Sequence, residues 1–443
     1  MHKVLILGAG LVARPIVRYF LRLGDVDVTV ASLYLEDAEA LVDNHSRGTA
    51  IAVDVGDTDS VEPLIEGSDL VVSLVPYALH VAVAGFAIRH QVDMITASYV
   101  SPEMRALDTE ARNAGVTILN ETGLDPGLDH MAAMRLIDQV RHAGGRVISL
   151  DSCCGGLPSP EAANNPWKYK FSWSPRGALL AGRLGARYLH EGRTVSVPGP
   201  ELFAHHWPYE VEGVGRFEMY PNRDSMPYID LYELKNLRSM RRGTIRYPGW
   251  CETMKVVADL GLLDIDERSH PPGATYGDLV SAGLPQGAGS VTERLARRLG
   301  IATDHEIIAR LEWAGLLSDE PLPEGEASLL DLVAARFQRL MVYRPGERDM
   351  VLQRHELVAS YPDKRPDERF VSLLVAYGEK TGDSATARSV SLPAAIAGDL
   401  MLRGKLKMPG VRIPTAPEIV RPVLERLEEL GITFKEWSEP VKA

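Results

Sequence analysis

The sequence predicts an α/β protein with three parts: an N-terminal doubly wound parallel sheet, a second α/β domain with a mixed sheet, and an inserted α-helical domain. Three observations lead to this fold class. Short β-rich runs alternate with helical patterns over residues 1–121, as in a parallel sheet with crossover helices. Strand-like runs separated by long turn-rich loops follow from 146 to about 250, and helical patterns dominate from 251 to about 345. The 443 residues are also enough for two or three domains.

Six short runs are the predicted strands of the first domain: KVLILG, VDVTVAS, TAIAVDV, DLVVSLVP, DMITAS and VTILNE. Between them, VARPIVRYFLRLG and VAVAGFAIRHQ carry apolar residues at three- and four-residue spacing, which predicts amphipathic helices. The stretch GLDPGLDHMAAMRLIDQVRHAGG then predicts a turn and a helix, with Asp125 as the N-cap and Pro126 at the first helical position.

The remaining chain predicts a substrate-binding part and further helices. Loops such as NNPWKYKFSWSPRG and YPNRDSMP separate the strands between 146 and 250, and such loops commonly carry binding residues. Helical patterns such as HEIIARLEWAGLL follow. After the strand-like run ERDMVLQRHELVAS, two more helices are predicted at LPAAIAGDLMLRG and APEIVRPVLERLEELG.

Charge and cysteine content exclude several classes of protein. A net charge of −12 works against nucleic acid or anionic lipid as a general partner, so any anion site must be local. Three cysteines cannot form a disulfide framework, which indicates a reducing compartment. The start of the chain lacks the features of a signal peptide, and no apolar run approaches the roughly 20 residues of a membrane helix. We therefore expect a cytoplasmic protein with no membrane and no nucleic-acid partner.

The stretch VLILGAGLVA carries the fingerprint of a dinucleotide-binding turn. It places Gly8, Gly10 and Ala13 between a predicted strand and a predicted helix. Gly8 allows the tight turn, Gly10 lets the backbone approach a pyrophosphate, and Ala13 keeps the helix close to the strand. The alternative is a helix–sheet turn without a cofactor. The first domain is therefore predicted to be a Rossmann-type domain.

The end of the second predicted strand bears on the choice of dinucleotide. Ser32 and Leu33 stand where an NAD enzyme usually has an acidic residue, so a 2′-phosphate would not be repelled. No arginine is present there to attract one, and the sequence therefore favours NADP only slightly. Asp54, at the end of the third strand, either reaches the adenosine portion or caps the following turn.

Three loops at the carboxyl ends of predicted strands are candidates for the reaction centre. Ligands of open α/β sheets bind outside these ends, where Pro76, Tyr77, Ser98, Tyr99 and Asp125 fall. For each residue taken alone, a structural role is as good an explanation as ligand binding. The tyrosines fit as half-buried aromatic residues, and Asp125 fits as a helix cap.

The pair Cys153–Cys154 stands next to Gly155 and Gly156 in CCGGLPSPE. No CxxC or HExxH spacing is present and His205–His206 is distant in sequence, so we expect no metal. No base for a nucleophilic thiol is evident. The choice lies between buried structural thiols and a thiol that lines a substrate pocket, where the glycines permit close backbone approach.

Two arginines stand in loops of a type that binds ligands: Arg223 in YPNRDS and Arg246 in GTIRYPGW. Guanidinium groups pair with carboxylates through two parallel hydrogen bonds, so these residues are suited to clamp a substrate with several carboxylates. A surface salt bridge is the alternative.

Five motifs, in this order and spacing, closely resemble saccharopine dehydrogenases of the NADP-dependent, L-glutamate-forming type: GLDPGLDH, CCGGLPSPE, NPWKYKFSWSPRG, YPNRDS and RGTIRYPGW. The resemblance runs from LILGAGLVARP to AIAGDLMLRGKLKMPG. It implies a Rossmann domain at 1–125 to which segment 390–443 returns, an α/β substrate-binding and dimerisation domain at 126–255 plus 345–389, and an α-helical insert at 256–344.

The resemblance also implies roles for individual residues. The dinucleotide is expected at Gly8, Gly10, Leu11, Val12, Ser32, Leu33, Asp54, Val55, Val75, Ser98, Leu124, Asp125, Pro126 and Ser174. The substrate is expected at Tyr77, Ser98, Tyr99, Asp125, Cys154, Ser174, Arg223, Thr244, Ile245 and Arg246. Tyr99, Asp125 and Cys154 are the expected catalytic residues, with Cys154 facing the substrate and Cys153 the core because strand side chains alternate.

The reaction implied by the resemblance joins L-glutamate to L-2-aminoadipate 6-semialdehyde as an imine, which NADPH reduces to saccharopine; the reverse oxidation uses NADP. The family commonly has an arginine in place of Leu33, so NAD remains an alternative cofactor. A homodimer is expected. The alternatives are a related imine-reducing dehydrogenase, such as a carboxynorspermidine synthase, and a non-catalytic dinucleotide-binding sensor.

Overall fold

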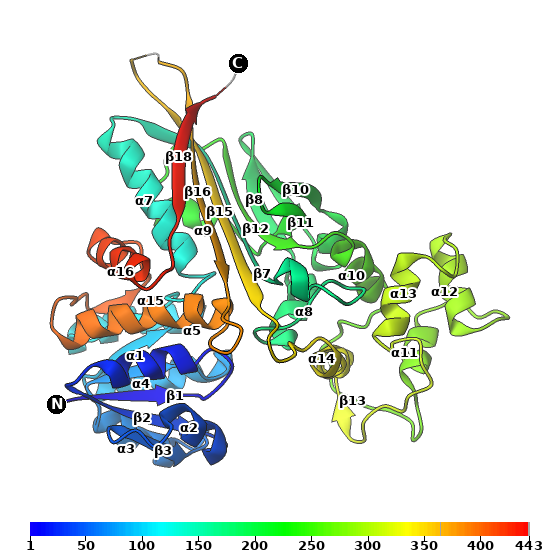
Figure 1. Cartoon of the computed structure of the whole chain (residues 1–443), viewed down its shortest axis with the longest axis horizontal. Helices are drawn as coiled ribbons and strands as arrows, with labels where there is room; N and C mark the ends of the chain where they lie inside the picture. The colour runs from blue at the N-terminus through cyan, green and yellow to red at the C-terminus, as the bar shows by residue number, and fades with distance from the viewer. Residues whose placement is uncertain (364, 442–443) are drawn as a thin grey trace. The chain divides into compact units, whose positions relative to one another are not determined.

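The chain forms two compact units in a computed structural model that describes residues 1–363 and 365–441. The first unit contains Met1–Arg146 and Ala359–Ala443, and the second contains Val147–Val358 (Figure 1). The first unit is therefore assembled from two segments that are far apart in the sequence. Among the described residues, no helix combines the length and the apolar character that crossing a membrane requires.

The first unit contains strands and helices in alternation. Its strands are β1 (His2–Leu7), β2 (Val26–Ser32), β3 (Gly48–Ala52), β4 (Leu70–Ser73), β5 (Asp93–Thr96), β6 (Thr117–Leu119), β16 (Glu368–Tyr377), β17 (Gly410–Arg412) and β18 (Lys435–Pro440). Its α-helices are α1 (Arg14–Arg22), α2 (Leu35–Val42), α3 (Thr58–Glu66), α4 (His80–Arg89), α5 (Pro102–Ala106), α6 (Asp108–Ala114), α7 (Leu128–His142), α15 (Ala385–Leu402) and α16 (Pro417–Glu429). All six predicted strands and the helices predicted around them are confirmed.

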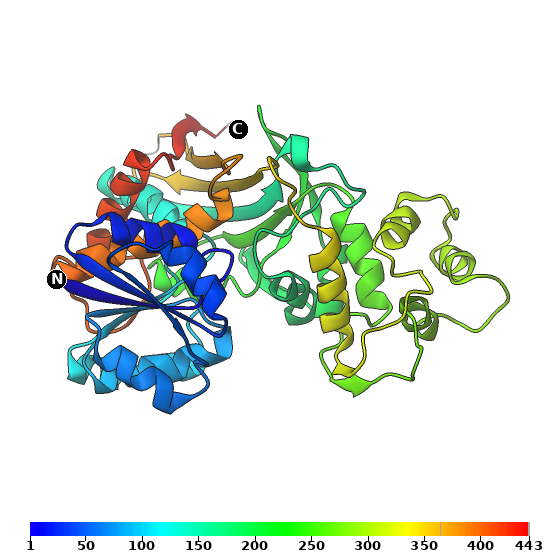
Figure 2. The ribbon, with the colours of Figure 1, turned by 60° about the horizontal axis from the view of Figure 1, so that its bottom comes forward.

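Seven of these strands form one parallel sheet in the order β17-β6-β5-β4-β1-β2-β3. The order reverses between β1 and β4, which is the switch point of a doubly wound sheet. Helices cover both faces: α1 and α15 pack together on one, and α3, α4 and α6 on the other (Figure 2). Leu5 and Leu7 of β1 belong to the core beneath α3 and α4, so the alternating Val4 and Ile6 face α1 and α15.

The helix predicted after the sixth strand begins two residues later than expected. Gly127 is its N-cap, so Asp125 is not the cap and Pro126 is not in the first turn. The 123–127 turn folds back on itself: Gly127 has φ +146°, and a Cβ there would lie 2.1 Å from the Gly123 carbonyl oxygen. Asp129 accepts a hydrogen bond from the Gly127 N–H at 2.5 Å, which leaves the Asp125 side chain available for other contacts.

The second unit combines a mixed sheet with a helical region. Its strands are β7 (Arg146–Pro158), β8 (Ala186–His190), β9 (Arg193–Val197), β10 (Trp207–Val211), β11 (Gly215–Pro221), β12 (Ser239–Arg246), β13 (Arg268–Ser269), β14 (Glu326–Ala327) and β15 (Asp349–Ser360). Its helices are α8 (Pro175–Leu184), α9 (Pro227–Leu231), α10 (Trp250–Asp259), α11 (Tyr276–Ala282), α12 (Val291–Leu299), α13 (Glu306–Trp313) and α14 (Leu329–Leu340). The strands of this unit follow the order β10-β11-β12-β7-β15, with β8 paired to both β12 and β9.

Aromatic side chains form the centre of the second unit where α10 and α14 meet the 165–171 loop. Trp167 contacts Trp250 and Phe337 edge to face, with ring centroids 5.6 and 5.1 Å apart. The Trp167 indole N–H donates to the Arg310 carbonyl oxygen at 2.8 Å, which satisfies its one polar atom in the core. The loop NPWKYKFSW is thus fixed by packing, although it contains little regular structure.

Candidate functional site

The turn after β1 has the geometry of a dinucleotide-binding turn. Gly8 has φ +103°, and a Cβ on it would approach the Leu74 carbonyl oxygen to 2.9 Å, so no other residue fits. A Cβ on Gly10 would meet nothing within 4 Å, which leaves the space that a pyrophosphate needs against the backbone. Leu11 is exposed, whereas Ala13 is fully buried where α1 meets the sheet. These residues fit a dinucleotide.

At the adenosine end of the candidate site, the second strand ends in Ser32, followed by Leu33, and not in a carboxylate. Ser32 is buried at the end of β2, and the Leu33 side chain is 59 % exposed. Asp54 accepts a hydrogen bond from the Gly56 N–H at 2.8 Å, so it does cap its own turn. Val55 points into the core, and only its backbone is available to a ligand.

Tyr99 and Asp125, both predicted to be catalytic, lie side by side. The Tyr99 hydroxyl donates to Asp125 Oδ1 at 3.1 Å. They come from the loops after β5 and β6, which are neighbouring strands of the sheet. A phenol hydrogen-bonded to a carboxylate can pass a proton to or from a water molecule beside it.

Ser98 is held by a buried histidine that sequence analysis missed. His80 Nε2 lies 2.7 Å from Ser98 Oγ, and its Nδ1 lies 2.8 Å from Ser73 Oγ. The ring also contacts the predicted substrate residue Tyr77 edge to face. Burial lowers the pKa of His80 to about 4, so the ring is neutral near pH 7. The signal was present in the SLVPYALH loop, where a histidine follows a strand end.

A second buried group, Glu121, fixes the residues on both sides of Tyr99. Its backbone N–H donates to the Ser98 carbonyl oxygen at 3.0 Å, and its Oε1 accepts from the Val100 N–H at 3.0 Å. Its Oε2 lies 2.8 Å from Nε2 of His130, which is fully buried. Glu121 adopts φ +55°, so this position is defined by the contacts rather than by backbone preference.

The cysteine pair lies in β7, paired in register with β12 so that Cys154 is opposite Thr244. Both thiols are buried. Burial, assisted by the Asp151 carboxylate, raises the pKa of Cys153 to about 12; Tyr209 and Arg241 lie near it. Cys154 instead lies within electrostatic reach of Arg246, as strand alternation predicts for the other face of the sheet.

The expectation that the glycines of this motif leave space for a ligand is wrong for Gly155. A Cβ on Gly155 would lie 2.8 Å from the Ile245 carbonyl oxygen. Gly155 therefore permits β7 and β12 to pack closely, and it does not open space for a ligand. Ile245 itself is fully buried, so only its backbone can contact a substrate.

Arg246 is not a surface residue, contrary to the salt-bridge alternative. It is 3 % exposed, and its guanidinium carbon lies 5.0 Å from the Tyr169 ring centroid and 5.5 Å from that of Trp250. Its Nη1 donates to the Ile245 carbonyl oxygen at 2.8 Å, but Nε has no hydrogen-bond partner among residues 1–363 and 365–441. No carboxylate in that part of the chain pairs with Arg246, so it retains capacity for a ligand carboxylate.

Arg223 and Ser174, two further residues of the second unit that were predicted to contact a ligand, are exposed. Arg223 follows β11 with φ +53°, and its carbonyl oxygen accepts from the Arg187 N–H at 2.9 Å. Ser174 is the N-cap of α8, and its Oγ accepts from the Gly177 N–H at 3.2 Å. Both are held by backbone hydrogen bonds.

A doubly wound sheet with this glycine turn at its switch point, and a tyrosine–carboxylate pair at the neighbouring strand ends, defines a dinucleotide-dependent oxidoreductase. Residues 4–119 match the family model of the saccharopine dehydrogenase NADP binding domain, and residues 123–432 match the saccharopine dehydrogenase C-terminal domain. The chain belongs to the saccharopine dehydrogenase family. Its cofactor is NADP.

Individual relatives agree along the whole chain. It is 40 % identical over 444 residues to saccharopine dehydrogenase [NADP(+), L-glutamate-forming] of Saccharomyces cerevisiae, with 98 % of each chain covered. The protein of the same name from Pyricularia oryzae is 38 % identical over 446 residues, again with 98 % of each covered. The solved apo structure of the L-Glu-forming enzyme from S. cerevisiae matches with a TM-score of 0.88 and 38 % identity, covering 99 % of this chain and 100 % of that one.

Proposed function

We propose that this enzyme catalyses the NADP-linked interconversion of saccharopine with L-glutamate and L-2-aminoadipate 6-semialdehyde. The relatives that match the whole chain bear the names of NADP(+)-dependent, L-glutamate-forming saccharopine dehydrogenases. The observation that carries the proposal is the buried Arg246, which has no carboxylate partner among the described residues. Saccharopine brings three carboxylates, and a buried guanidinium binds such a group strongly.

We assign the cofactor to the turns at the switch point. The backbone of Gly8, Gly10, Leu11 and Val12 would bind the pyrophosphate at the start of α1. Further contacts are proposed at Ser32, Leu33, Asp54, Val55, Val75 and Ser98, at the Leu124–Pro126 turn, and at Ser174. Bound NADPH supplies the hydride that reduces the C=N bond. The protein must align the imine carbon and exclude competing water.

We assign proton transfer to the Tyr99–Asp125 pair, acting through water during formation and dehydration of the carbinolamine. Their hydrogen bond places a donor and an acceptor together. Cys154 is proposed to form part of the substrate wall with Thr244 and Arg246, whereas Tyr77, Ser98 and Arg223 are proposed to contact other parts of the substrate.

Turnover of saccharopine tests the proposal. Oxidation of saccharopine with NADP is followed through the absorbance of NADPH. We expect Arg246→Gln to lower kcat/KM for saccharopine on the order of 100-fold, because a charged hydrogen bond contributes about 1.5–3 kcal/mol. Arg216→Gln, which removes an 86 % exposed arginine from β11, is the control and should leave kcat/KM unchanged.

The same assay distinguishes the alternatives. Reduction of an imine formed with a diamine, without turnover of saccharopine, would instead assign the chain to the carboxynorspermidine type. Bound NADP without turnover of any imine would indicate a sensor.

We further propose that the enzyme is a cytoplasmic homodimer. Three free, buried cysteines suit a reducing compartment. Light scattering should give twice the chain mass of 48.6 kDa, and cell fractionation should recover the activity with cytoplasmic markers. A mass of one chain, or activity with a membrane or organelle fraction, would contradict the corresponding part of this proposal.

A further inference from the structure

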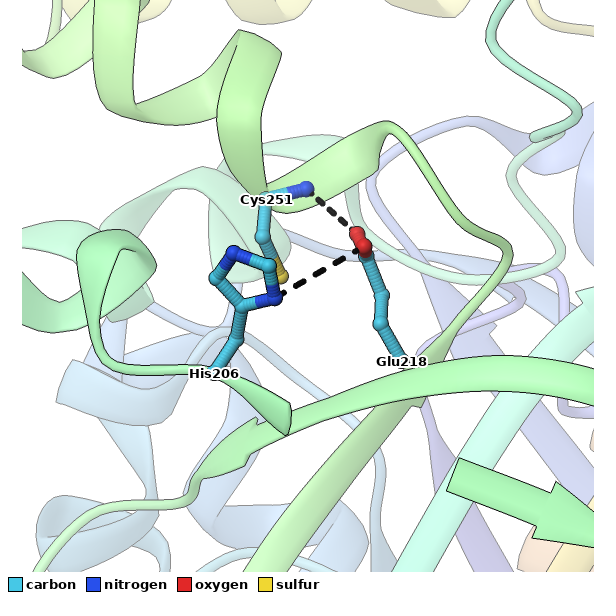
Figure 3. Close-up of side chains that lie close together, drawn as sticks. All are labelled: His206, Glu218 and Cys251. Carbon is cyan, nitrogen blue, oxygen red and sulfur yellow. Dashed lines mark hydrogen bonds and ion pairs between the residues drawn. The ribbon is translucent and has the colours of Figure 1, made fainter. Parts of the chain in front are cut away.

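Three potential metal ligands of different chemical types meet in the second unit (Figure 3). His206 directly precedes β10, Glu218 lies on β11, and Cys251 lies in the first turn of α10. Their ligand atoms all lie within 4.8 Å of one another. Because the three positions are far apart in the sequence, no spacing motif revealed them.

The His206 ring leaves a buried polar atom unsatisfied. Its Nδ1 has no accessible surface and no hydrogen-bond partner in the described part of the chain. The nearest carboxylate atom, Glu218 Oε2, is 3.8 Å away, which is too long for a hydrogen bond. An orphaned buried nitrogen of this kind calls for a missing partner, and an ion is one candidate.

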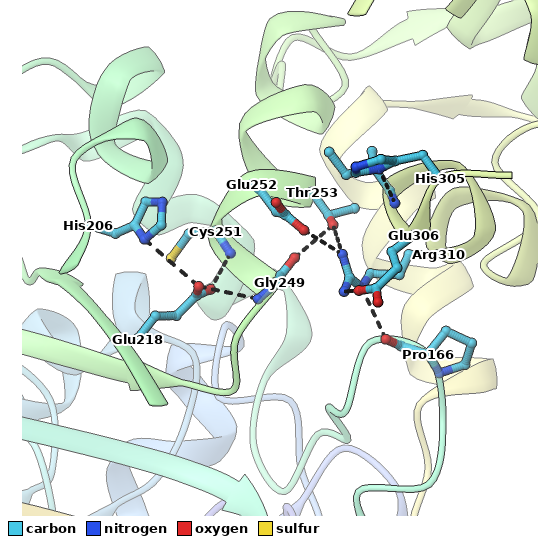
Figure 4. A network of polar contacts seen from close by, with 11 residues as sticks. Pro166, His206, Glu218, Gly249, Cys251, Glu252, Thr253, His305, Glu306 and Arg310 are labelled. Carbon is cyan, nitrogen blue, oxygen red and sulfur yellow. Dashed lines mark hydrogen bonds and ion pairs between the residues drawn. The ribbon is translucent and has the colours of Figure 1, made fainter. Parts of the chain in front are cut away.

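Glu218 is already oriented toward the centre of the cluster. One carboxylate oxygen accepts from the Cys251 N–H at 2.6 Å and the other from the Gly249 N–H at 3.2 Å (Figure 4). Each oxygen has a second lone pair, so these bonds do not prevent coordination. The helix that donates them is itself anchored, because Arg310 binds Glu252 and Thr253 at 2.8 and 3.2 Å.

We propose that His206, Glu218 and Cys251 bind one divalent transition-metal ion, with Zn²⁺ as the preferred ion and water as the fourth ligand. Nitrogen, thiolate and carboxylate together are characteristic zinc donors. The His206 side chain is 32 % exposed, which leaves a route for the ion and a position for water. Zinc bonds of about 2.0–2.3 Å require the three donors to move closer, and the loop position of His206 permits this.

The charged groups around the three ligands limit the affinity of the site for a metal ion. Burial raises the pKa of the Cys251 thiol, and the Glu218 carboxylate raises it further, so the ion must displace a tightly held proton. The N-terminus of α10 and the nearby Arg246 oppose a cation, whereas Glu218 and the Cys251 thiolate together offset its two positive charges. The balance favours an ion that forms a strong bond to sulfur, and it excludes Mg²⁺ and Ca²⁺.

Titration of the metal-free full-length protein with Co²⁺, a spectroscopic substitute for Zn²⁺, tests this site. We expect a thiolate-to-cobalt charge-transfer band that saturates at one equivalent and disappears when Zn²⁺ is added. Cys251→Ser should abolish the band, whereas Cys153→Ser, which removes another buried thiol of the same unit, should retain it.

A second variant tests whether metal binding can be weakened without unfolding the protein. Glu218→Gln keeps one acceptor oxygen for the N–H groups at the N-terminus of α10 but lacks the charge. It should weaken Zn²⁺ binding on the order of 10–100-fold without changing the circular dichroism spectrum. Absence of a saturable band, equal binding by Cys251→Ser, or unchanged affinity of Glu218→Gln would overturn the proposal and identify any bound ion as adventitious. These readouts are independent of turnover.

Discussion

At the scale of single residues, the candidate site of the first unit contains two supporting side chains that were not predicted, His80 and Glu121. Ser98 and Tyr99 were predicted from their position at a strand end, but His80 and Glu121 hold them in place. Such supporting groups are hard to find from one sequence, because their role follows from contacts between loops of different strands. A buried histidine in a strand-end loop is the one local signal.

We expect His80→Asn to lower kcat/KM for saccharopine about tenfold, because a neutral hydrogen bond contributes about 0.5–1.5 kcal/mol. An asparagine amide extends to the position of Nδ1 and can bind Ser73, but it cannot reach Ser98. A glutamine extends to the position of Nε2, so His80→Gln should restore most of the activity. Steady-state kinetics on both variants checks this, and equal losses would show that His80 acts only in packing.

We predict that Leu33 controls the discrimination between NADP and NAD. Its exposed side chain offers no charge to a 2′-phosphate. Leu33→Arg should raise the NADP-to-NAD ratio of kcat/KM about tenfold or more, because an added charge-assisted hydrogen bond contributes about 1.5–3 kcal/mol. Leu184→Arg, which adds the same charge at an exposed position of α8, should leave the ratio unchanged. An unaltered ratio in Leu33→Arg would place the phosphate elsewhere.

At the scale of elements, we predict different roles for the two glycines of the turn between β1 and α1. Gly8 is needed for folding, and Gly10 is needed for cofactor binding. We expect Gly8→Ala to destabilise the protein, since its Cβ would meet the Leu74 backbone at a positive φ. Gly10→Ala has space for its methyl group and should preserve the melting temperature, but the methyl occupies the approach of the pyrophosphate and should weaken NADP binding. Thermal unfolding and NADP titration of both variants check this. Normal NADP binding by Gly10→Ala would contradict the assigned pyrophosphate position.

Prediction of elements succeeded where the pattern was local. The six strands of the first domain and the helices between them carry clear periodicity, and the structure confirms them. The seventh strand, β17, is only three residues long and exists because it pairs with β6, so nothing in its own sequence marks it. The start of α7 was predicted two residues too early, because Pro126 was taken as the first helical residue. The tight contact between Gly123 and Gly127 instead keeps Pro126 in the turn before the helix. The three-part domain division remains a prediction.

At the scale of the whole molecule, stability should depend on pH through His80. Its pKa is about 4 when folded, against 6.5 ordinarily, because burial disfavours the imidazolium. As the pH falls below 6.5 the unfolded chain binds the proton first, so stability decreases until about pH 4. The full loss is about 3 kcal/mol. Urea unfolding at several pH values should show a smaller decrease for His80→Gln; equal decreases would rule out this contribution.

The discontinuous first unit has a consequence for protein synthesis. Residues 410–412 complete the sheet that begins at residue 2, so a ribosome must translate almost the whole chain before the edge at β6 is covered. A nascent chain would expose the unpaired backbone of β6 during that interval, and exposed edges recruit other strands. Folding of this enzyme in the cell should therefore depend on chaperones, and premature termination should produce aggregates rather than a free nucleotide-binding domain.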